Sequence, residues 1–308
     1  MTRGFEIMNY KLVGIGEVLW DLLPGGRQLG GAPGNFASHA RSLGASVVLA
    51  SRVGDDALGR EAIGRLAQLG IPPVAIEVDA SRPTGTVGVE LSADGQPRFD
   101  IHRGVAWDAI EGNAAARDAV AVADAVCFGT LAQRSAPSRA AIRALVASSP
   151  PQALRILDVN LRQDYYSDEI LRESLALANV LKLNDAELPR LAELLSLPGD
   201  ERAQLQALST RHRLRLIAYT RGSRGSLLFA DGRWSEHPGI TAHVVDTIGA
   251  GDSFTAAMAV GFLSGWDLDR INAQANRVAA YVCSCPGATP DLPAELRGEF
   301  SACPNCRG

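Results

Sequence analysis

The chain has 308 residues, 46% of them hydrophobic, so it is long enough for a large globular core and is not disordered in composition. Its formal net charge of −4 excludes the strongly basic surface typical of nucleic-acid-binding proteins. It has no run of about 18 apolar residues, so we expect no membrane span, and its N-terminus lacks the apolar stretch of a signal peptide. Five cysteines, an odd count in a chain too large to need disulfides, favour a reducing cytoplasm.

Strand-like apolar segments alternate with helix-like segments along most of the chain. We expect strands at 11–18, 46–54, 74–78, 125–129, 155–160, 179–184, 214–220 and 225–230. We expect helices at 35–44, 61–70, 138–147, 168–178, 185–195 and 201–209. This alternation predicts an α/β fold with a doubly wound, mostly parallel sheet and helices on both of its faces.

Two segments interrupt the alternation. Residues 19–33 combine turn signals with short apolar pieces, and residues 84–104 predict an antiparallel hairpin with its turn at Asp94-Gly95. Together they are expected to form a small sheet that projects from the main body. There is no internal repeat or low-complexity linker, so we expect a single domain over residues 1–308 with these two segments inserted in it.

The most informative motif is DTIGAGDSF at 246–254, directly before an apolar run. Glycines before a helix let backbone N–H groups point into one cavity, and the helix N-terminus adds partial positive charge. The amides of Gly249, Ala250, Gly251 and Asp252 are therefore expected to stabilise a phosphate. The Asp252 carboxylate would repel a phosphate, but it can take the proton of a hydroxyl that attacks the phosphorus. The simpler alternative is that Asp252 is only a helix N-cap.

Lysine and cysteine narrow the chemistry further. The chain has only two lysines, Lys11 and Lys182, and neither lies in a glycine-rich loop, which excludes a P-loop. The pairs Cys283/Cys285 and Cys303/Cys306 are similar to half of a zinc ribbon. However, one residue separates the first pair where two are usual, so idle thiols are the alternative.

The segment DTIGAGDSFTAAMAVGFL resembles the C-terminal signature D-T-x-G-A-G-D of ribokinase-like sugar kinases, the phosphofructokinase B family. Residues 29–59 resemble the family's N-terminal signature, G-G-x-x-x-N followed by G-x-D. The resemblance extends from GEVLWD at 16–21 to PGA at 286–288. It implies a doubly wound α/β domain with a small β-sheet lid, and ATP-dependent phosphorylation of a sugar.

The resemblance also implies a site for the acceptor sugar. Gly30, Gly31 and Asn35 match the family's sugar-binding segment, and Asp21 matches the aspartate that binds sugar hydroxyls. The alternatives are a tight turn with an N-cap at Asn35, and a surface position for Asp21.

Two basic residues are further candidates for contact with the substrate. Residues 158–162 (DVNLR) resemble the D-x-N-x-R of fructokinase-like members, and strand alternation would put Asp158, Asn160 and Arg162 on one side. Arg162 could neutralise the transferred phosphate or form a structural salt bridge. Arg103, on the predicted lid strand, could reach the sugar or be a solvated edge charge.

The nucleotide side of the site is implied by two further matches. Asn184 and Glu187 match the family's N-x-x-E element, which organises Mg²⁺ and its waters near the triphosphate, although a capping box would have the same spacing. Thr220, Gly222 and Gly225 match its T-x-G-x-x-G nucleotide loop, a weak signal by itself.

The last matches concern the adenine and a monovalent cation. Asn276 and the loop 284–288 match the family's adenine wall. The same loop resembles a K⁺ site together with the Asp246 side chain and the Ile248 carbonyl.

The sequence thus predicts a cytoplasmic, ATP- and Mg²⁺-dependent sugar kinase, most like a bacterial fructokinase and dimeric through its lid. One alternative is a kinase for 2-keto-3-deoxygluconate, in which Arg103 would pair with the substrate carboxylate. A nucleoside kinase fits less well, because GEVLWDLLP and DVNLR resemble fructokinases more closely. An alternative of another class is a non-catalytic sugar-sensing protein.

Overall fold

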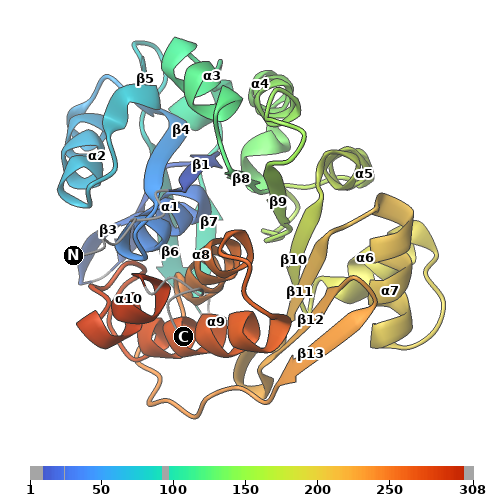
Figure 1. Ribbon diagram of the computed structural model, residues 1–308. Helices are drawn as coiled ribbons and strands as arrows, with labels where there is room; N and C mark the ends of the chain where they lie inside the picture. The colour runs from blue at the N-terminus through green and yellow to red at the C-terminus, as the bar shows by residue number, and fades with distance from the viewer. Residues whose placement is uncertain (1–9, 24, 92–96, 302–308) are drawn as a thin grey trace, which may run out of the picture.

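The computed structural model describes residues 10–23, 25–91 and 97–301, which form a nine-stranded and a four-stranded sheet (Figure 1). The order in the large sheet is β13-β12-β11-β10-β9-β8-β1-β4-β5. Its strands are β1 (Lys11–Ile15), β4 (Ser46–Gly54), β5 (Ile76–Asp79), β8 (Ala125–Phe128), β9 (Leu154–Asp158), β10 (Val180–Asn184), β11 (Leu216–Thr220), β12 (Ser226–Ala230) and β13 (Arg233–His237). All neighbouring pairs from β5 to β11 are parallel, and β12 and β13 add an antiparallel edge.

Helices cover both faces of the large sheet, and each face has its own apolar core. One face packs against α1 (Ala32–Ser42), α2 (Ala57–Gln68), α8 (Ala250–Leu263) and α9 (Leu268–Cys283). The other packs against α3 (Ala114–Ala121), α4 (Ala136–Ala147), α5 (Asp168–Leu177), α6 (Leu188–Leu195) and α7 (Glu201–His212). Helix α10 (Ala294–Ser301) follows α9. The predicted doubly wound, mostly parallel architecture is therefore confirmed.

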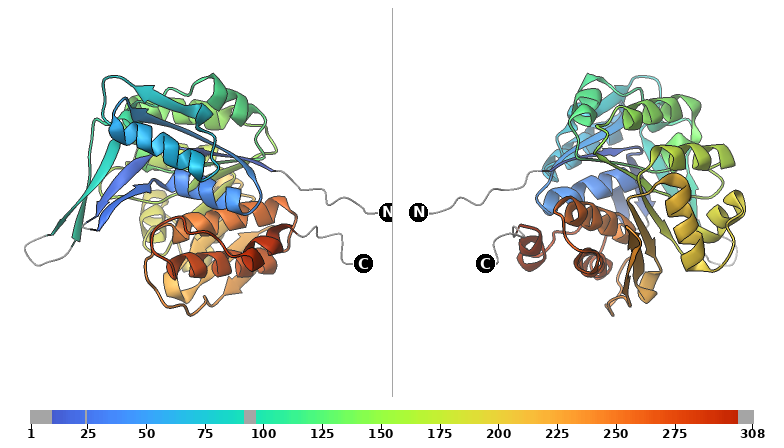
Figure 2. Two further views of the ribbon diagram at one scale, coloured as in Figure 1. Left: turned by 90° about the vertical axis from the view of Figure 1, so that its left-hand side faces the viewer. Right: turned by 45° about the vertical axis from the view of Figure 1, so that its right-hand side comes forward.

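The small sheet is built from the two segments that interrupt the alternation. Strands β2 (Leu19–Leu23), β3 (Gly26–Gly30), β6 (Gly85–Leu91) and β7 (Pro97–Ile101) are ordered β3-β2-β6-β7, and β6 and β7 pair antiparallel as predicted. The sheet projects from one side of the α/β body (Figure 2). The predicted turn at Asp94-Gly95 lies outside the described residues.

Several predicted boundaries were wrong by a few residues. Helix α1 begins at Ala32, three residues earlier than predicted, because Pro33 suits the first turn of a helix. Helix α2 begins at Ala57, since the Asp56 side chain caps it by accepting the Gly59 N–H at 2.7 Å. Elements α3, β13, α9 and α10 were not predicted.

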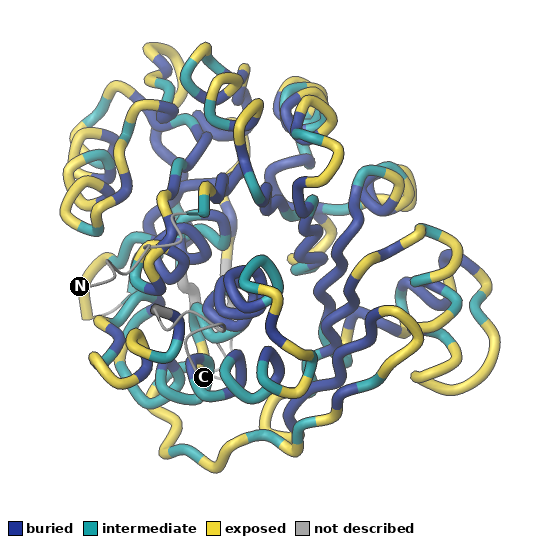
Figure 3. Tube along the Cα trace, in the orientation of Figure 1, coloured by how far each residue is buried: buried dark blue, intermediate teal, exposed yellow. Residues whose placement is uncertain are grey.

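Helix α8 is largely enclosed. Every residue from Ser253 to Gly261 is buried, as the dark tube at the centre of Figure 3 shows. Its apolar residues therefore extend round the helix, which is typical of a helix inside a large core. The first turn, residues 250–252, is half-buried and lies directly before this buried run.

Candidate active site

The site lies where the chain order of the large sheet reverses. Strand β1 has β4 on one side and β8 on the other, so the carboxyl ends of β1 and β8 form the topological switch point, where open α/β sheets usually bind their ligands. The N-terminal ends of α1 and α8 carry the two signature segments to this region. These two helices pack directly on each other.

The turn before α8 has the backbone geometry expected for an anion site. Gly249 is the N-cap, with φ +77°, and no side chain caps the helix. A β-carbon at Gly249 would overlap the Ala288 carbonyl, so only glycine fits where the 284–288 loop approaches the turn. The Ala250 N–H makes a long bond of 3.4 Å to the Thr247 carbonyl, and the first N–H groups of a helix have no partner within the helix, so they can face a ligand. Asp252 is the third residue of the helix, which rules out the N-cap alternative.

The two signature segments meet through one hydrogen bond. The Asn35 side-chain amide donates to Asp252 Oδ2 at 2.8 Å. Asn35 is 6% exposed and lies inside the first turn of α1, whose N-cap is Gly31, so it is not an N-cap either. The structure thus joins the predicted sugar-binding segment to the predicted base.

The environment of Asp252 favours a carboxyl that can exchange a proton near neutral pH. The residue keeps part of its surface accessible, while the protein atoms crowded around its carboxyl raise its pKa to about 6. The negative charge of Asp158 raises the pKa further, and the Asn35 amide and the charges of Lys182 and Arg162 oppose this.

Glu17 is a buried acid of this site that the sequence analysis missed. It is 4% exposed, follows β1, and accepts the Ala32 N–H of the first turn of α1 at 3.2 Å. Burial raises its pKa to about 7, and the charge of Asp252 acts in the same direction. A β-carbon at Gly31, which has φ +112°, would overlap the Glu17 carbonyl, so the Gly-Gly turn packs directly on this segment. The sequence did contain a signal for this residue, because Glu17 is an acid within the apolar segment 11–18.

Asp21 lies on β2 of the small sheet, next to the glycine turn. A β-carbon at Gly30 would overlap the Asp21 carboxylate, which places the carboxylate against the predicted sugar-binding glycines. Burial raises the pKa of Asp21 to about 6; the Arg162 charge lowers it and the Asp246 charge raises it. This half-buried position differs from the alternative of an ordinary surface aspartate.

The predicted alternation of DVNLR was wrong. Strand β9 ends at Asp158, and Asn160 adopts φ +40°, so the chain leaves the extended conformation before Arg162. Asp158 is buried, Asn160 is half-buried and Arg162 is exposed. The Arg162 guanidinium nevertheless acts electrostatically on Glu17, Asp21 and Asp252, so it faces the site.

Arg103 follows β7 and lies against the loop after β9. Its guanidinium lies 4.5 Å from the centre of the Tyr165 ring and 3.6 Å from the Asp164 carboxylate. The side chain is 65% exposed, so a ligand could reach it. Arg134 stacks on Tyr165 as well and donates to the carbonyls of the 101–102 segment, which fixes the backbone that carries Arg103.

The Asn184–Glu187 element is a tight turn anchored by the Glu187 carboxylate. Glu187 accepts the N–H of Leu161 at 3.0 Å and that of Asn184 at 2.8 Å, while Asn184 Oδ1 accepts the N–H groups of Ala186 and Glu187. These bonds have the form of a capping box, so that alternative describes the local structure correctly. Burial raises the pKa of Glu187, and the Lys182 charge lowers it.

The predicted nucleotide loop follows β11. Thr220 ends the strand, and Gly222 and Gly225 both have positive φ, of 57° and 77°. Asn276 on α9 is 8% exposed, and its amide donates to Ser226 Oγ at 2.7 Å, behind this loop.

Asp246 connects the two loops that were predicted to hold K⁺. Its carboxylate accepts the Ile248 N–H at 3.0 Å and the Gly287 N–H at 3.2 Å. His39, buried in α1, reaches the same loop with Nε2 2.9 Å from the Ala288 carbonyl oxygen. Burial lowers the pKa of His39 to about 4, which keeps the ring neutral.

The described residues contain no cluster of three or more His, Cys, Asp or Glu that could hold a metal by itself. Cys283 and Cys285 are free thiols, and Cys303 and Cys306 lie outside the described residues. No helix in the described part of the chain is long and apolar enough to cross a membrane.

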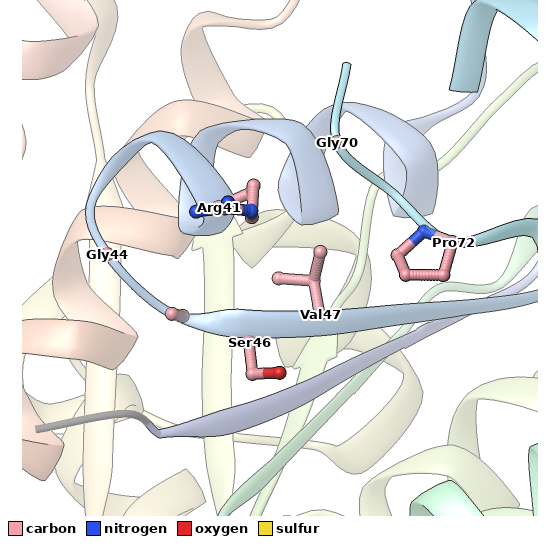
Figure 4. Close-up of a pocket in the computed structure, with 7 residues that line it drawn as sticks. Arg41, Gly44, Ser46, Val47, Gly70 and Pro72 are labelled. Carbon is pink, nitrogen blue, oxygen red and sulfur yellow. The ribbon is translucent and has the colours of Figure 1, made fainter. Parts of the chain in front are cut away.

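One surface hollow lies away from this site. Its volume is about 540 Å³, and it is lined by Arg41, Gly44, Ala45, Ser46, Val47, Gly70 and Pro72 (Figure 4). These residues surround the C-terminal end of α1 and the start of β4, at the opposite end of the strands from the switch point. Because ligands of open α/β sheets bind at the carboxyl ends of the strands, we assign it no catalytic role.

The doubly wound body and its small sheet define a ribokinase-like α/β protein. A solved structure of an uncharacterised sugar kinase from Pyrococcus horikoshii in complex with ATP has a TM-score of 0.78 at 28% identity, over 94% of this chain and 99% of that one. The 2-dehydro-3-deoxygluconokinase of Thermotoga maritima has a TM-score of 0.82 at 18% identity, over 95% and 98%. A double mutant of Vibrio cholerae fructokinase was solved with fructose, ADP and potassium. It has a TM-score of 0.77 at 21% identity, over 97% of this chain and 100% of that one. The last two likenesses concern the fold alone.

The model of the pfkB family of carbohydrate kinases matches residues 25–295, and the chain belongs to this family. A putative sugar kinase of Pyrococcus horikoshii is 31% identical over 267 residues, which are 84% of this chain and 82% of that protein. The fructokinase of Klebsiella pneumoniae is 31% identical over 295 residues, or 92% and 94%. The protein is therefore an ATP-dependent carbohydrate kinase.

Proposed function

We propose that this kinase transfers the γ-phosphoryl group of ATP to a primary hydroxyl of fructose, with Asp252 as the general base. The contact between Asn35 and Asp252 carries the proposal, because it joins the sugar-binding signature to the phosphate-binding signature. The likeness to fructokinases favours fructose.

The reaction is a direct in-line transfer. The sugar oxygen bonds to the γ-phosphorus while the bond from that phosphorus to the bridging oxygen of ATP breaks, and ADP leaves with that electron pair. Asp252 receives the proton of the hydroxyl. The N–H groups of the first turn of α8 stabilise the charge on the transferred group. Asp21, Asn35 and the Gly30-Gly31 turn hold the sugar.

The nucleotide side of the site offers Mg²⁺ few protein groups, chiefly the Glu187 carboxylate. Each oxygen of Glu187 accepts one backbone N–H and keeps a lone pair that could accept a hydrogen bond from a metal-bound water. Mg²⁺ retains much of its water, so one anchored carboxylate is adequate provision, and Asn184, whose Oδ1 already accepts two N–H groups, holds the turn that carries it. When bound, the ion screens the phosphate charges. The protein's own contribution is to position the Glu187 carboxylate, through the N–H of Leu161 after β9 and the N–H of Asn184 at the end of β10.

Three further properties belong to this proposal. Thr220, Gly222, Gly225 and Asn276 bind the nucleotide. A K⁺ ion binds at Asp246 and the Ile248 carbonyl, which the potassium-bound Vibrio cholerae fructokinase supports by analogy. The protein is a cytoplasmic homodimer that pairs through its small sheet, where Leu22 exposes 40% of its surface.

The rival substrate is a sugar acid, and Arg103→Ala separates the two. Fructose has no carboxylate, so we expect the variant to lose about tenfold or less in kcat/KM with fructose, the value of ordinary hydrogen bonds. A kinase built for 2-keto-3-deoxygluconate would prefer the acid in wild type and lose about a hundredfold or more with the variant. Arg233→Ala on the edge strand β13 is the matched control. A wild-type preference for the acid that collapses without Arg103 would contradict the fructose assignment.

The pKa of Asp252 predicts the acid limb of the pH profile. The base must be deprotonated to accept the proton, so kcat/KM should fall as the pH drops through about 6. Burial raises the pKa values of Asp21 and Glu17 as well, and the limb will therefore report apparent values for the interacting group. A profile that is flat between pH 5 and 8, measured as steady-state rates at several fructose concentrations, would argue against a carboxylate base of this kind.

Catalysis and sugar sensing can be separated in one pair of measurements. A thermal-shift titration with fructose alone reports binding, and coupled ADP release with fructose and ATP reports turnover. We expect both signals. Stabilisation by fructose without ADP release would favour the non-catalytic alternative.

A further inference from the structure

A buried ion pair lies beneath the first turn of α8, and the proposed mechanism does not use it. Lys182 on β10 and Asp158 at the end of β9 are directly paired across the two strands. Lys182 Nζ lies 3.0 Å from Asp158 Oδ1, and both side chains are 7% exposed. Removing two charges from water is costly, and a well-packed apolar pair is often equally stable at such a position. The pair therefore calls for a role beyond packing.

This pair is connected to the phosphate-binding turn from below. The Thr255 hydroxyl lies 3.0 Å from Asp158 Oδ2 and 2.9 Å from the Gly251 carbonyl oxygen, and it can donate its single hydrogen to either. A β-carbon at Gly251 would lie 3.0 Å from Lys182 Nζ, so the ammonium group packs directly against the turn. The Lys182–Asp158 ion pair and the Thr255 hydroxyl thus connect the first turn of α8 to strands β9 and β10.

We propose that Lys182, Asp158 and Thr255 are positioning residues for phosphoryl transfer, which hold the first turn of α8 and set the charge around Asp252. This inference rests on the proposed role of Asp252 as the base. Lys182 contributes positive charge beneath the N–H groups that face the phosphate, and Asp158 keeps that charge buried and in place.

The two members of the pair have opposite effects on the pKa of Asp252. The charged groups that act on Asp252 come from the segment after β1, the end of β9, the middle of β10 and the loop after β9: Glu17, Asp158, Lys182 and Arg162. The Cys127 thiol of β8 belongs to the same group and stays protonated, because burial raises its pKa. Lys182 lowers the pKa of Asp252 and Asp158 raises it.

The test uses the pH profile of kcat/KM with fructose. Lys182→Met should lower kcat at least about tenfold and move the acid limb to higher pH by about one unit. Asp158→Asn should move the limb to lower pH. The double variant should return the limb toward its wild-type position while kcat stays low. Lys11→Met, which changes the other lysine at an exposed position, is the matched control.

Thr255 supplies a milder arm if the charge variants do not fold. Thr255→Val should lower kcat severalfold with little change in KM for ATP or fructose, and Thr255→Ser should restore it. The inference is overturned if the folded Lys182 and Asp158 variants keep kcat within threefold of wild type with an unmoved acid limb. It is equally overturned if the limb stays fixed while kcat falls, or if Thr255→Val matches Thr255→Ser. A wild-type enzyme inactive toward every sugar would instead contradict the proposed function.

Discussion

Asp252→Asn should lower kcat for fructose phosphorylation by about 10²- to 10⁴-fold, the usual cost of removing a general base. The amide keeps the shape of the side chain and can still accept the Asn35 hydrogen bond, but it cannot take the proton of the attacking hydroxyl. The KM values should change little, because both substrates still bind. Steady-state kinetics at saturating ATP measure this directly.

The Asp252→Asn variant should also fold at least as well as wild type at pH 8. Burial raises the folded-state pKa of Asp252 to about 6, above its unfolded value near 4, so the folded state favours the protonated form. The charged carboxylate therefore destabilises the fold above pH 6, and the neutral amide removes this penalty. Asp269→Asn, in the exposed first turn of α9, is the matched control. A folded Asp252→Asn variant that keeps more than about a tenth of wild-type kcat would show that Asp252 is not the base.

Asp21→Ala should weaken fructose binding about tenfold or more and leave ATP binding nearly unchanged. A hydrogen bond to a charged group contributes about 1.5–3 kcal/mol, and a carboxylate can accept bonds from two hydroxyls. Asp21 lies against Gly30 on the small sheet, away from the nucleotide loop after β11. Calorimetric titration with each ligand separates the two affinities.

The control for Asp21 comes from the same sheet. Asp100 on β7 is exposed and pairs with His102 at 3.5 Å, so Asp100→Ala should leave both affinities intact. Equal weakening of fructose and ATP binding by Asp21→Ala, or no effect at all, would contradict the sugar-binding assignment.

The sequence predicted the architecture well because its signals were local. Glycine-terminated helices and apolar strands alternate along the chain, and the small sheet appeared as two segments that break this pattern. The errors arose where a local signal was outweighed by tertiary contacts. Asp158 and Asn160 looked like parts of one continuing strand, but the strand ends at Asp158 and the positive φ of Asn160 turns the chain away.

The site residues that sequence reasoning missed are buried charged groups. Glu17 and Lys182 stand in otherwise apolar strand segments, where single charged residues are costly unless paired. A charged residue in an apolar segment can be seen in the sequence, but the groups that pair with it cannot. Glu17 caps α1 through Ala32, and Lys182 pairs with Asp158, contacts that only the fold brings together.

The most direct measurement of the central claim is product formation by wild type over a panel of acceptors. Fructose, ribose, 2-keto-3-deoxygluconate, tagatose and nucleosides should be compared by kcat/KM with ATP and Mg²⁺, and the phosphorylated position identified by ³¹P NMR. We predict that fructose gives the highest kcat/KM, that the phosphate is on a primary hydroxyl, and that Asp252→Asn abolishes the signal. ADP release that no acceptor raises above the rate in water, or turnover that survives in Asp252→Asn, would contradict the account.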